Sequence, residues 1–179
     1  MRIITGKRRG LRLLTLEGED TRPTADRVKE ALFSMLADRV SGAKVLDLFA
    51  GSGALGLECI SRGAERCDFV EANPKAADVV KKNIEKAQFT QEATLCRVDF
   101  RQFLKGAAGA YDLIFLDPPY RSGFYQEALR MIAERELLAP GGRIIAEWDV
   151  EKPEFLPFTE EKEKAYGRVH ISILRESME

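Results

Sequence analysis

The segment at residues 45–56, VLDLFAGSGALG, decides the fold. VLDLF has the apolar composition of a short buried strand, and it runs directly into the glycine-rich sequence G-S-G-A-L-G. Glycines in a strand-to-helix turn let the backbone approach a ligand closely. The G-x-G-x-x-G spacing is typical of dinucleotide sites, and Glu71 stands where that fingerprint has its acid. The glycines alone leave open whether a dinucleotide, another ligand or no ligand is held here.

Strand-like and helical stretches alternate outward from this segment. The strand-like runs lie at residues 44–49, 67–72, 93–98, 111–117 and 142–148, and the helical stretches at 54–62, 75–88, 99–105 and 123–138. This alternation predicts right-handed βαβ crossovers and a parallel sheet covered on both faces. Residues 158–167 and 168–176 instead predict two strands joined by a tight turn at Tyr166-Gly167. We therefore expect a doubly wound α/β fold with a mostly parallel seven-stranded sheet and an antiparallel C-terminal hairpin.

The N-terminal part precedes this core. Residues 1–16 read as two short strands around the basic turn GKRRG, which predicts a β-hairpin. A helix is expected over residues 21–40, because Val28, Ala31, Leu32 and Leu36 share one apolar face, and Thr24 is a natural N-cap. We expect one domain over 1–179, made of a basic hairpin extension (1–17), the leading helix (21–40) and the core (44–179).

Composition excludes several classes of protein. The chain is 45% hydrophobic and 32% charged, the balance of a soluble protein, and no apolar run suits a membrane span or a signal peptide. The cysteines Cys59, Cys67 and Cys96 show no C-x-x-C spacing, so we expect neither a disulfide framework nor a metal site. We therefore expect a cytoplasmic protein that needs no metal and no membrane.

Charge is distributed unevenly along the chain. The net charge is -1, yet residues 1–12 contain Arg2, Lys7, Arg8, Arg9 and Arg12 and no acid. This asymmetry indicates either an arm that contacts an anionic partner or a solubilising terminus.

Asp47 discriminates between ligands at the glycine loop. A dinucleotide would place its pyrophosphate over this turn, where a nearby carboxylate would oppose it by about 4 kcal/mol per close charge pair at an effective dielectric of 20. A ligand with a cationic ammonium, such as S-adenosylmethionine, would be attracted instead. Glu71 does not discriminate, since it could accept hydrogen bonds from the ribose of either cofactor. The residues therefore favour the methyl donor.

The sequence LDPPY at residues 116–120 ends the fourth expected strand. Asp-Pro-Pro is compatible with a simple turn. It also suits the activation of an exocyclic amino group, because the Asp117 carboxylate and the Pro118 carbonyl, held rigid by Pro119, could accept its two N–H groups and aim its lone pair at a methyl group. The ring of Tyr120 could stack on an extruded base.

These motifs resemble those of known enzymes. VLDLFAGSGALGLE resembles the first motif of the Rossmann-like S-adenosylmethionine-dependent methyltransferases, and DPPY resembles the fourth motif of amino-methyltransferases acting on adenine, cytosine or guanine. The resemblance implies that S-adenosylmethionine contacts the following residues: Asp47, Phe49, Gly51, Gly53, Glu71, Asp99 and Phe100. In it Asp47 faces the methionine end, Glu71 holds the ribose, and Asp99-Phe100 bind the adenine. Asp99 is equally compatible with a helix N-cap.

The longer segments MRIITGKRRGLRL, TRPTADRVKEALFSML, VLDLFAGSGALGLECISRGA and FLDPPY together resemble the bacterial small-subunit ribosomal RNA guanine-N2 methyltransferases. This resemblance implies methylation of one guanine of 16S rRNA, in the small subunit or an assembly intermediate, by a monomer that uses S-adenosylmethionine. It also implies RNA contacts by Lys7, Arg8, Arg9, Arg12, Arg22 and Arg121. Thr24 would lie beside the cofactor entrance, covering the methionine end or contacting RNA.

Two alternatives remain open from the sequence. One is an amino-methyltransferase acting on adenine or another base in RNA or DNA, because DPPY does not encode the base. The other is a non-catalytic RNA-binding assembly factor. His170 and Trp148 are expected to be structural, and His170 is expected to lie away from the strand ends that carry motifs.

Overall fold

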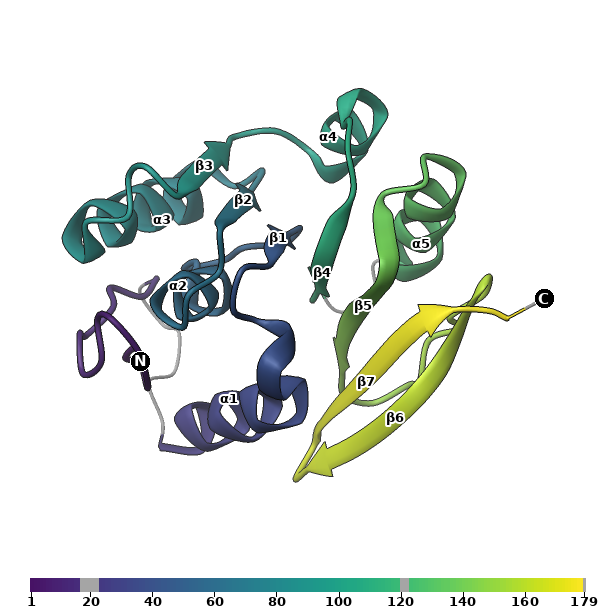
Figure 1. The fold of residues 1–179 in the computed structure, drawn as a ribbon, viewed down its shortest axis with the longest axis horizontal. Helices are drawn as coiled ribbons and strands as arrows, with labels where there is room; N and C mark the ends of the chain where they lie inside the picture. The colour runs from purple at the N-terminus through teal and green to yellow at the C-terminus, as the bar shows by residue number, and fades with distance from the viewer. Residues whose placement is uncertain (17–22, 120–122, 179) are drawn as a thin grey trace.

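The computed structural model describes residues 1–16, 23–119 and 123–178, without the side chains of residues 23 and 24. Its centre is a seven-stranded sheet in the order β3-β2-β1-β4-β5-β7-β6 (Figure 1). The strands are β1 (Lys44–Asp47), β2 (Arg66–Val70), β3 (Ala93–Cys96), β4 (Tyr111–Leu116), β5 (Leu138–Trp148), β6 (Phe158–Tyr166) and β7 (Val169–Glu176). Strands β1 to β5 pair in parallel, and β7 pairs antiparallel with both β5 and β6. The predicted sheet and its antiparallel C-terminal hairpin are therefore confirmed.

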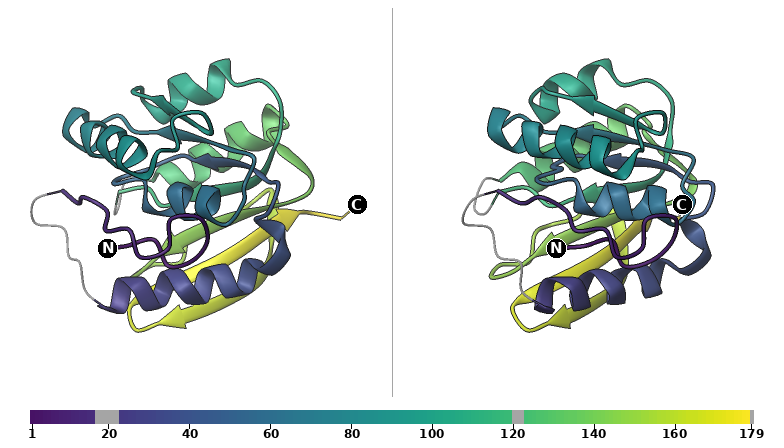
Figure 2. Two further views of the ribbon diagram at one scale, coloured as in Figure 1. Left: turned by 60° about the vertical axis from the view of Figure 1, so that its left-hand side comes forward. Right: turned by 90° about the vertical axis from the view of Figure 1, so that its left-hand side faces the viewer.

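Helices cover both faces of the sheet (Figures 1 and 2). The helices are α1 (Pro23–Leu36), the short 3-10 helix η1 (Ala37–Arg39), α2 (Ala54–Ser61), α3 (Pro74–Ala87), α4 (Phe100–Gly106) and α5 (Phe124–Glu134). Apolar side chains of α1, α2 and α3 pack on one face with Val45, Phe69 and Phe115. Those of α4 and α5 pack on the other face with Leu46 and Ile114. This alternation along each strand is the period expected for strands buried on both sides.

The structure corrects some element boundaries. Each of the first four strands ends earlier than predicted, because the acids and glycines that follow leave the sheet to form turns. The helix predicted over 123–138 ends at Glu134; Glu136 then takes a left-handed φ of 52°, and Leu138 already belongs to β5. An apolar run that continues from a helix into a buried strand shows no break in hydrophobicity, which is why the sequence pattern merged them.

The N-terminal arm, residues 1–16, is only partly the predicted hairpin. It doubles back through an isolated antiparallel bridge between Arg2 and Arg12, with Ile3 N donating to Leu11 O at 2.9 Å. The pairing does not extend far enough to form two regular strands. Figure 2 shows the arm lying beside α1 and α2. Ile3 and Leu13 are buried in the core beneath it. The arm is therefore held mainly by its buried side chains and its contacts with the helices. Hydrogen bonds between its own two halves contribute less.

Across residues 1–16, 23–119 and 123–178, no helix combines the length and apolarity required to cross a lipid bilayer.

Candidate active site

Acidic residues gather at one edge of the sheet. Because β1 to β5 are parallel, their carboxyl ends meet at this edge, where ligands bind in open α/β sheets. Each of the five strands ends in, or is soon followed by, an acid: Asp47, Glu71, Asp99, Asp117 and Glu147. The first four were predicted from the sequence as site residues. Glu147 was not, although it too is an acid at the end of a strand.

Asp47 is buried at the end of β1, with 3% of its surface exposed. Its Oδ2 accepts a hydrogen bond from Gly56 N at 3.2 Å, inside the first turns of α2. Burial raises the pKa of Asp47 to about 7; the Gly56 hydrogen bond opposes this rise and the charge of Glu71 adds to it. A cation placed beside Asp47 would favour its ionised form, whereas a pyrophosphate would not.

The glycine loop is held by Glu71. Glu71 Oε1 accepts from Gly51 N at 2.8 Å and Oε2 accepts from Asn73 N at 3.0 Å, so this carboxylate joins the loop after β1 to the turn after β2. Gly51 has a φ of 59°, and a Cβ built there would meet no atom within 4 Å. The backbone at Gly51 therefore faces open space and can receive a ligand closely.

The other two glycines of the motif serve different purposes. Gly53 is the left-handed N-cap of α2, with a φ of 83°. A Cβ at Gly56 would lie 2.3 Å from the Phe69 ring, so Gly56 allows α2 to pack closely against β2. The loop thus combines one position open to a ligand with two that shape the turn.

Three phenylalanines gather beside this loop. The ring centroid of Phe100 lies 5.1 Å from that of Phe49 and 5.0 Å from that of Phe124. The Arg101 guanidinium lies over the Phe100 and Phe124 rings, at 4.6 and 4.7 Å from their centroids. Phe100 is 3% exposed and belongs to the core, whereas Phe49 and Phe124 are partly exposed and could pack against a planar ligand group. Phe124 was not identified from the sequence, because it comes from a different helix.

Asp99 caps α4. Its side chain accepts from Arg101 N at 2.8 Å, which is the N-cap contact considered from the sequence. Asp99 is also exposed; its Oδ2 accepts from Arg101 Nη1 at 3.4 Å and keeps further acceptor capacity for a ligand.

Asp117 and Glu147 form a carboxyl pair at the ends of β4 and β5. Part of Asp117 is exposed, and protein atoms crowd the rest of its carboxyl. This desolvation, followed by the charges of Glu147 and Asp47, raises the pKa of Asp117 well above its ordinary range. Desolvation likewise raises the pKa of Glu147, which is hydrogen-bonded to Asp117. Asp117 therefore holds a proton to higher pH than a carboxyl group in a solvated turn would.

A cleft of about 760 Å³ opens beside Asp117. It lies between the segment after β4, the start of α5 and the segment after β5, and the residues that line it include Pro118, Pro119, Tyr125, Gln126, Trp148 and Asp149. Its volume is in the range of small-molecule sites. Within the cleft wall Trp148 stacks on His170, with ring centroids 4.1 Å apart.

The position of His170 corrects one expectation. His170 pairs with Trp148 across β5 and β7, so it lies at the same sheet edge as the motifs. The prediction that His170 lies away from the strand ends that carry motifs was therefore wrong. Because β7 is antiparallel to β5, it begins at the edge of the sheet where β5 ends.

The arm carries cations in two different states. Lys7, Arg9 and Arg12 are exposed. Arg8 is held on the protein: its Nε donates to Ala87 O at 2.6 Å, and its guanidinium lies 5.4 Å from the Phe89 ring centroid. Arg8 therefore caps the C-terminus of α3, while Lys7, Arg9 and Arg12 point to solvent. The fifth cation of the arm, Arg2, is also exposed and has its Nε 3.7 Å from Asp26 Oδ2.

Tyr120, Arg121 and Arg22 lie outside the described residues, as does the side chain of Thr24. Among the side chains that are described, no group of histidines, cysteines or acids is arranged to hold a metal ion.

Comparison with known proteins gives consistent matches. The model of the family described as Conserved hypothetical protein 95 matches residues 1–175. The ribosomal RNA small subunit methyltransferase D of Haemophilus influenzae is 37% identical over 94% of this chain and 90% of its own length. The protein of the same name from Escherichia coli K12 is 35% identical over 84% of this chain and 76% of its own length. A solved structure of the Escherichia coli protein yhhF is 30% identical, with a TM-score of 0.87 over 100% of this chain and 99% of that one.

Proposed function

Because the chain belongs to the Conserved hypothetical protein 95 family, with relatives named ribosomal RNA small subunit methyltransferase D, we propose that it methylates ribosomal RNA. The methyl donor is S-adenosylmethionine, and the acceptor is the exocyclic N2 amino group of a guanine in 16S rRNA, free or in the assembling small subunit. One observation carries this proposal: Asp117-Pro118-Pro119 follows β4, the neighbour of β1 from which the glycine loop begins, and Pro118 and Pro119 line the cleft.

The residues at the sheet edge fit the proposed cofactor. S-adenosylmethionine, when bound, supplies an electrophilic methyl group on a sulfonium. Asp47 would favour its cationic methionine end, and the open backbone at Gly51 leaves room for close approach. Glu71 keeps acceptor capacity for ribose hydroxyls beyond its two amide contacts. Phe49 would pack against the adenine, and Phe100, which is buried with its ring centroid 5.1 Å from that of Phe49, would support that ring.

The acceptor chemistry belongs to Asp117 and Pro118. The lone pair of a guanine amino group is conjugated with the ring and is a poor nucleophile. Acceptors on its two N–H groups would turn it toward the methyl group and hold the nitrogen in line, which is a positioning effect. The cleft beside Pro118 and Pro119 is large enough for a base taken out of its stack. Base flipping is how enzymes reach atoms that a helix conceals.

Incubation of the protein with labelled S-adenosylmethionine tests the proposal. Small subunits, free 16S rRNA, tRNA and duplex DNA are offered separately, and mass spectrometry identifies the methylated nucleoside. N2-methylguanosine from ribosomal RNA alone is the expected product. N6-methyladenosine would favour the adenine alternative, and tight RNA binding without transfer would favour the non-catalytic one.

The exposed cations of the arm are proposed to contact RNA phosphates, which would position the substrate without selecting a sequence. Replacing Lys7, Arg9 and Arg12 together by glutamine should reduce the slope of log affinity against log salt by about 2, since each phosphate contact on single strands contributes about 0.7. A filter-binding or fluorescence titration at several salt concentrations measures this.

The matched control is the replacement of Lys162, Lys164 and Arg168 by glutamine. These exposed residues carry the same charge on the β6–β7 hairpin, away from the arm (Figure 1). Equal losses of slope in the two triple variants would contradict a specific role for the arm.

A further inference from the structure

The register of β4 and β5 brings two acids together. Leu116, the last residue of β4, pairs with Ala146 of β5, so Asp117 and Glu147 follow at the next position on adjacent strands. Leu116 and Ala146 pack in the core on the α4–α5 face. Because successive side chains alternate between faces, Asp117 and Glu147 both turn to the opposite face, on which Asp47 also lies.

The surroundings of this pair are acidic. The carboxyl groups of Asp117 and Glu147 are hydrogen-bonded to each other, and the charges of Asp47 from β1 and Asp149 beyond β5 also act on Asp117. Among the described residues that line the neighbouring cleft, the cation is Lys152, and it is engaged elsewhere, with Nζ 2.8 Å from a carboxylate oxygen of both Glu160 and Glu163. Two carboxyl groups in contact among further acids cannot both ionise without strong repulsion, so the pair retains one proton in its stable state.

Glu147 is fixed more firmly than Asp117. It lies within β5, where it pairs with Ile171 of β7. Its backbone carbonyl also accepts a hydrogen bond from the Tyr125 hydroxyl of α5. Asp117 instead stands in the segment that follows β4, next to Pro118. The contact between the carboxyls therefore links a loop residue to a rigid strand.

We propose that Glu147 is a positioning residue for the methyl transfer: it holds Asp117 through a shared proton and leaves one Asp117 oxygen facing the amino group of the substrate. This inference rests on the proposed function. As the nitrogen–methyl bond forms, the amino nitrogen becomes positively charged while the donor leaves as a thioether. An N–H bond then breaks, its electron pair stays on nitrogen, and the proton moves to the available Asp117 oxygen. The pair, now carrying two protons, returns one to water.

A pH profile of single-turnover transfer tests the role of Glu147. Wild-type protein should lose rate on the alkaline side with an apparent pKa above the ordinary carboxyl range, because the pair then gives up its shared proton and the two carboxylates repel each other. Glu147→Gln keeps a hydrogen-bond donor for Asp117 that cannot ionise, so this alkaline limb should disappear, while the rate at the wild-type optimum stays within about threefold of wild type. On the acid side, where Asp117 itself is protonated and cannot accept a proton, the two proteins should lose rate alike. Glu147→Ala should lose about tenfold at the same optimum, since Asp117 is no longer held.

Asp149→Asn is the matched control. It removes an acid from the same strand end that acts on Asp117 only through its charge, so it should keep the alkaline limb with a small shift. An alkaline limb in Glu147→Gln that coincides with the wild-type limb would overturn the proposal, even if the overall rate fell.

A measurement without RNA separates this proposal from the proposed function. Infrared difference titration of the protein alone should show a carboxylic acid that persists well above pH 7, where Asp47 with its pKa of about 7 has ionised, and that disappears in Glu147→Gln. If wild-type protein transferred no methyl group to RNA but showed this shared proton, the proposed function would fail while the carboxyl pair stood. Absence of the neutral carboxyl in wild type would overturn the pair itself.

Discussion

Replacement of Asp117 by alanine is expected to lower the single-turnover rate of methyl transfer by about 10³-fold, while S-adenosylmethionine binding stays within about threefold. The alanine variant loses an acceptor that orients the amino group and also the oxygen that receives its proton. The cofactor contacts proposed for Asp47, Gly51 and Glu71 are untouched, so calorimetry should give a similar dissociation constant. Quenched-flow transfer from labelled cofactor measures the rate.

Asp117→Asn is the matched control for this result. Asparagine keeps an acceptor oxygen and nearly the same size but cannot take up the proton. The transfer rate of Asp117→Asn should therefore fall less than that of Asp117→Ala, by about 10- to 100-fold. Its pH profile should also lack the fall in rate at low pH that protonation of Asp117 causes in the wild type. An alanine variant that transfers methyl groups at the wild-type rate would refute the role of Asp117 in the chemistry.

Much of the candidate site was predictable because it depends on local order in the chain. In a parallel sheet the strand ends meet at one edge, so acids that follow strand-like runs must come together. Asp47, Glu71 and Asp117 were identified from the glycine-loop and DPPY motifs near such strand ends, and Asp99 from the family resemblance. Glu147 lies as close to the end of β5 but belongs to none of these motifs, so it was not identified.

What the sequence could not predict are contacts between elements distant in the chain. Phe124 joins Phe49 and Phe100 only because α5 packs beside α4. Arg8 was grouped with the other cations of the arm, yet the end of α3 binds its guanidinium. The local sequence shows where charges lie and how apolar residues repeat. It does not show which charged side chains will contact other elements once the chain has folded.

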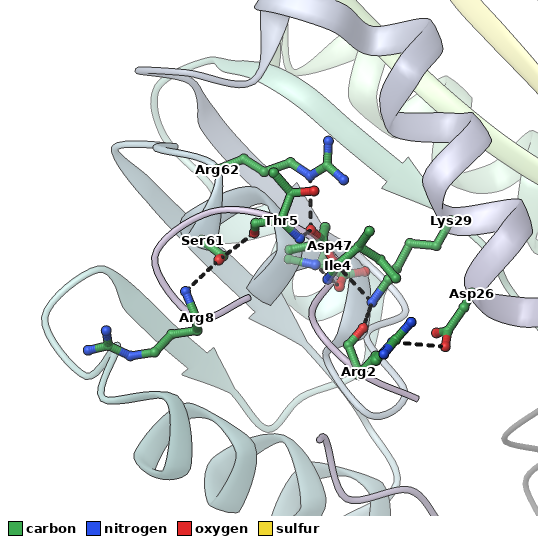
Figure 3. A network of polar contacts seen from close by, with 11 residues as sticks. Arg2, Ile4, Thr5, Arg8, Asp26, Lys29, Asp47, Ser61 and Arg62 are labelled. Carbon is green, nitrogen blue, oxygen red and sulfur yellow. Dashed lines mark hydrogen bonds and ion pairs between the residues drawn. The ribbon is translucent and has the colours of Figure 1, made fainter. Parts of the chain in front are cut away.

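Glu58 is a further case. It is the only charged residue in α2, whose sequence is ALGLECIS, and it is completely buried. Lys29 of α1 is 3% exposed, with its Nζ 3.1 Å from Glu58 Oε1 (Figure 3). Arg62 Nε donates to Glu58 Oε2 at 2.9 Å. A lone acid in an apolar helix indicates a buried partner, but the partner itself could not be identified.

Glu58 also binds the backbone of the arm. Its two oxygens accept from Ile4 N at 2.8 Å and Thr5 N at 3.1 Å, while Lys29 Nζ donates to Arg2 O at 2.5 Å (Figure 3). One carboxylate therefore joins α1, α2 and the arm. This arrangement fixes the exposed cations of the arm relative to the sheet edge, so RNA would meet a surface that is already ordered.

Glu58→Ala is expected to lower the free energy of unfolding by about 3–5 kcal/mol, the usual loss when one member of a buried ion pair is removed. The change leaves the ammonium of Lys29 buried without its anion and two backbone N–H groups without acceptors. Burial already lowers the pKa of Lys29, and Glu58 opposes that shift, so the pKa of Lys29 should fall further in the variant. Chemical denaturation measures the loss of unfolding free energy, and thermal denaturation should show a fall in Tm of about 10 °C.

The double variant Glu58→Leu/Lys29→Met separates the charge from the rest of the network. Removing both charges together avoids an isolated buried ion, so the double variant should be more stable than Glu58→Ala. It should not recover wild-type stability, because the amides of Ile4 and Thr5 still lack acceptors. In both variants trypsin should cleave within the arm faster than in wild type, since the arm has lost its anchor. A Glu58→Ala protein within about 1 kcal/mol of wild type, with an arm equally resistant to trypsin, would show that Ile3 and Leu13 alone hold the arm in place.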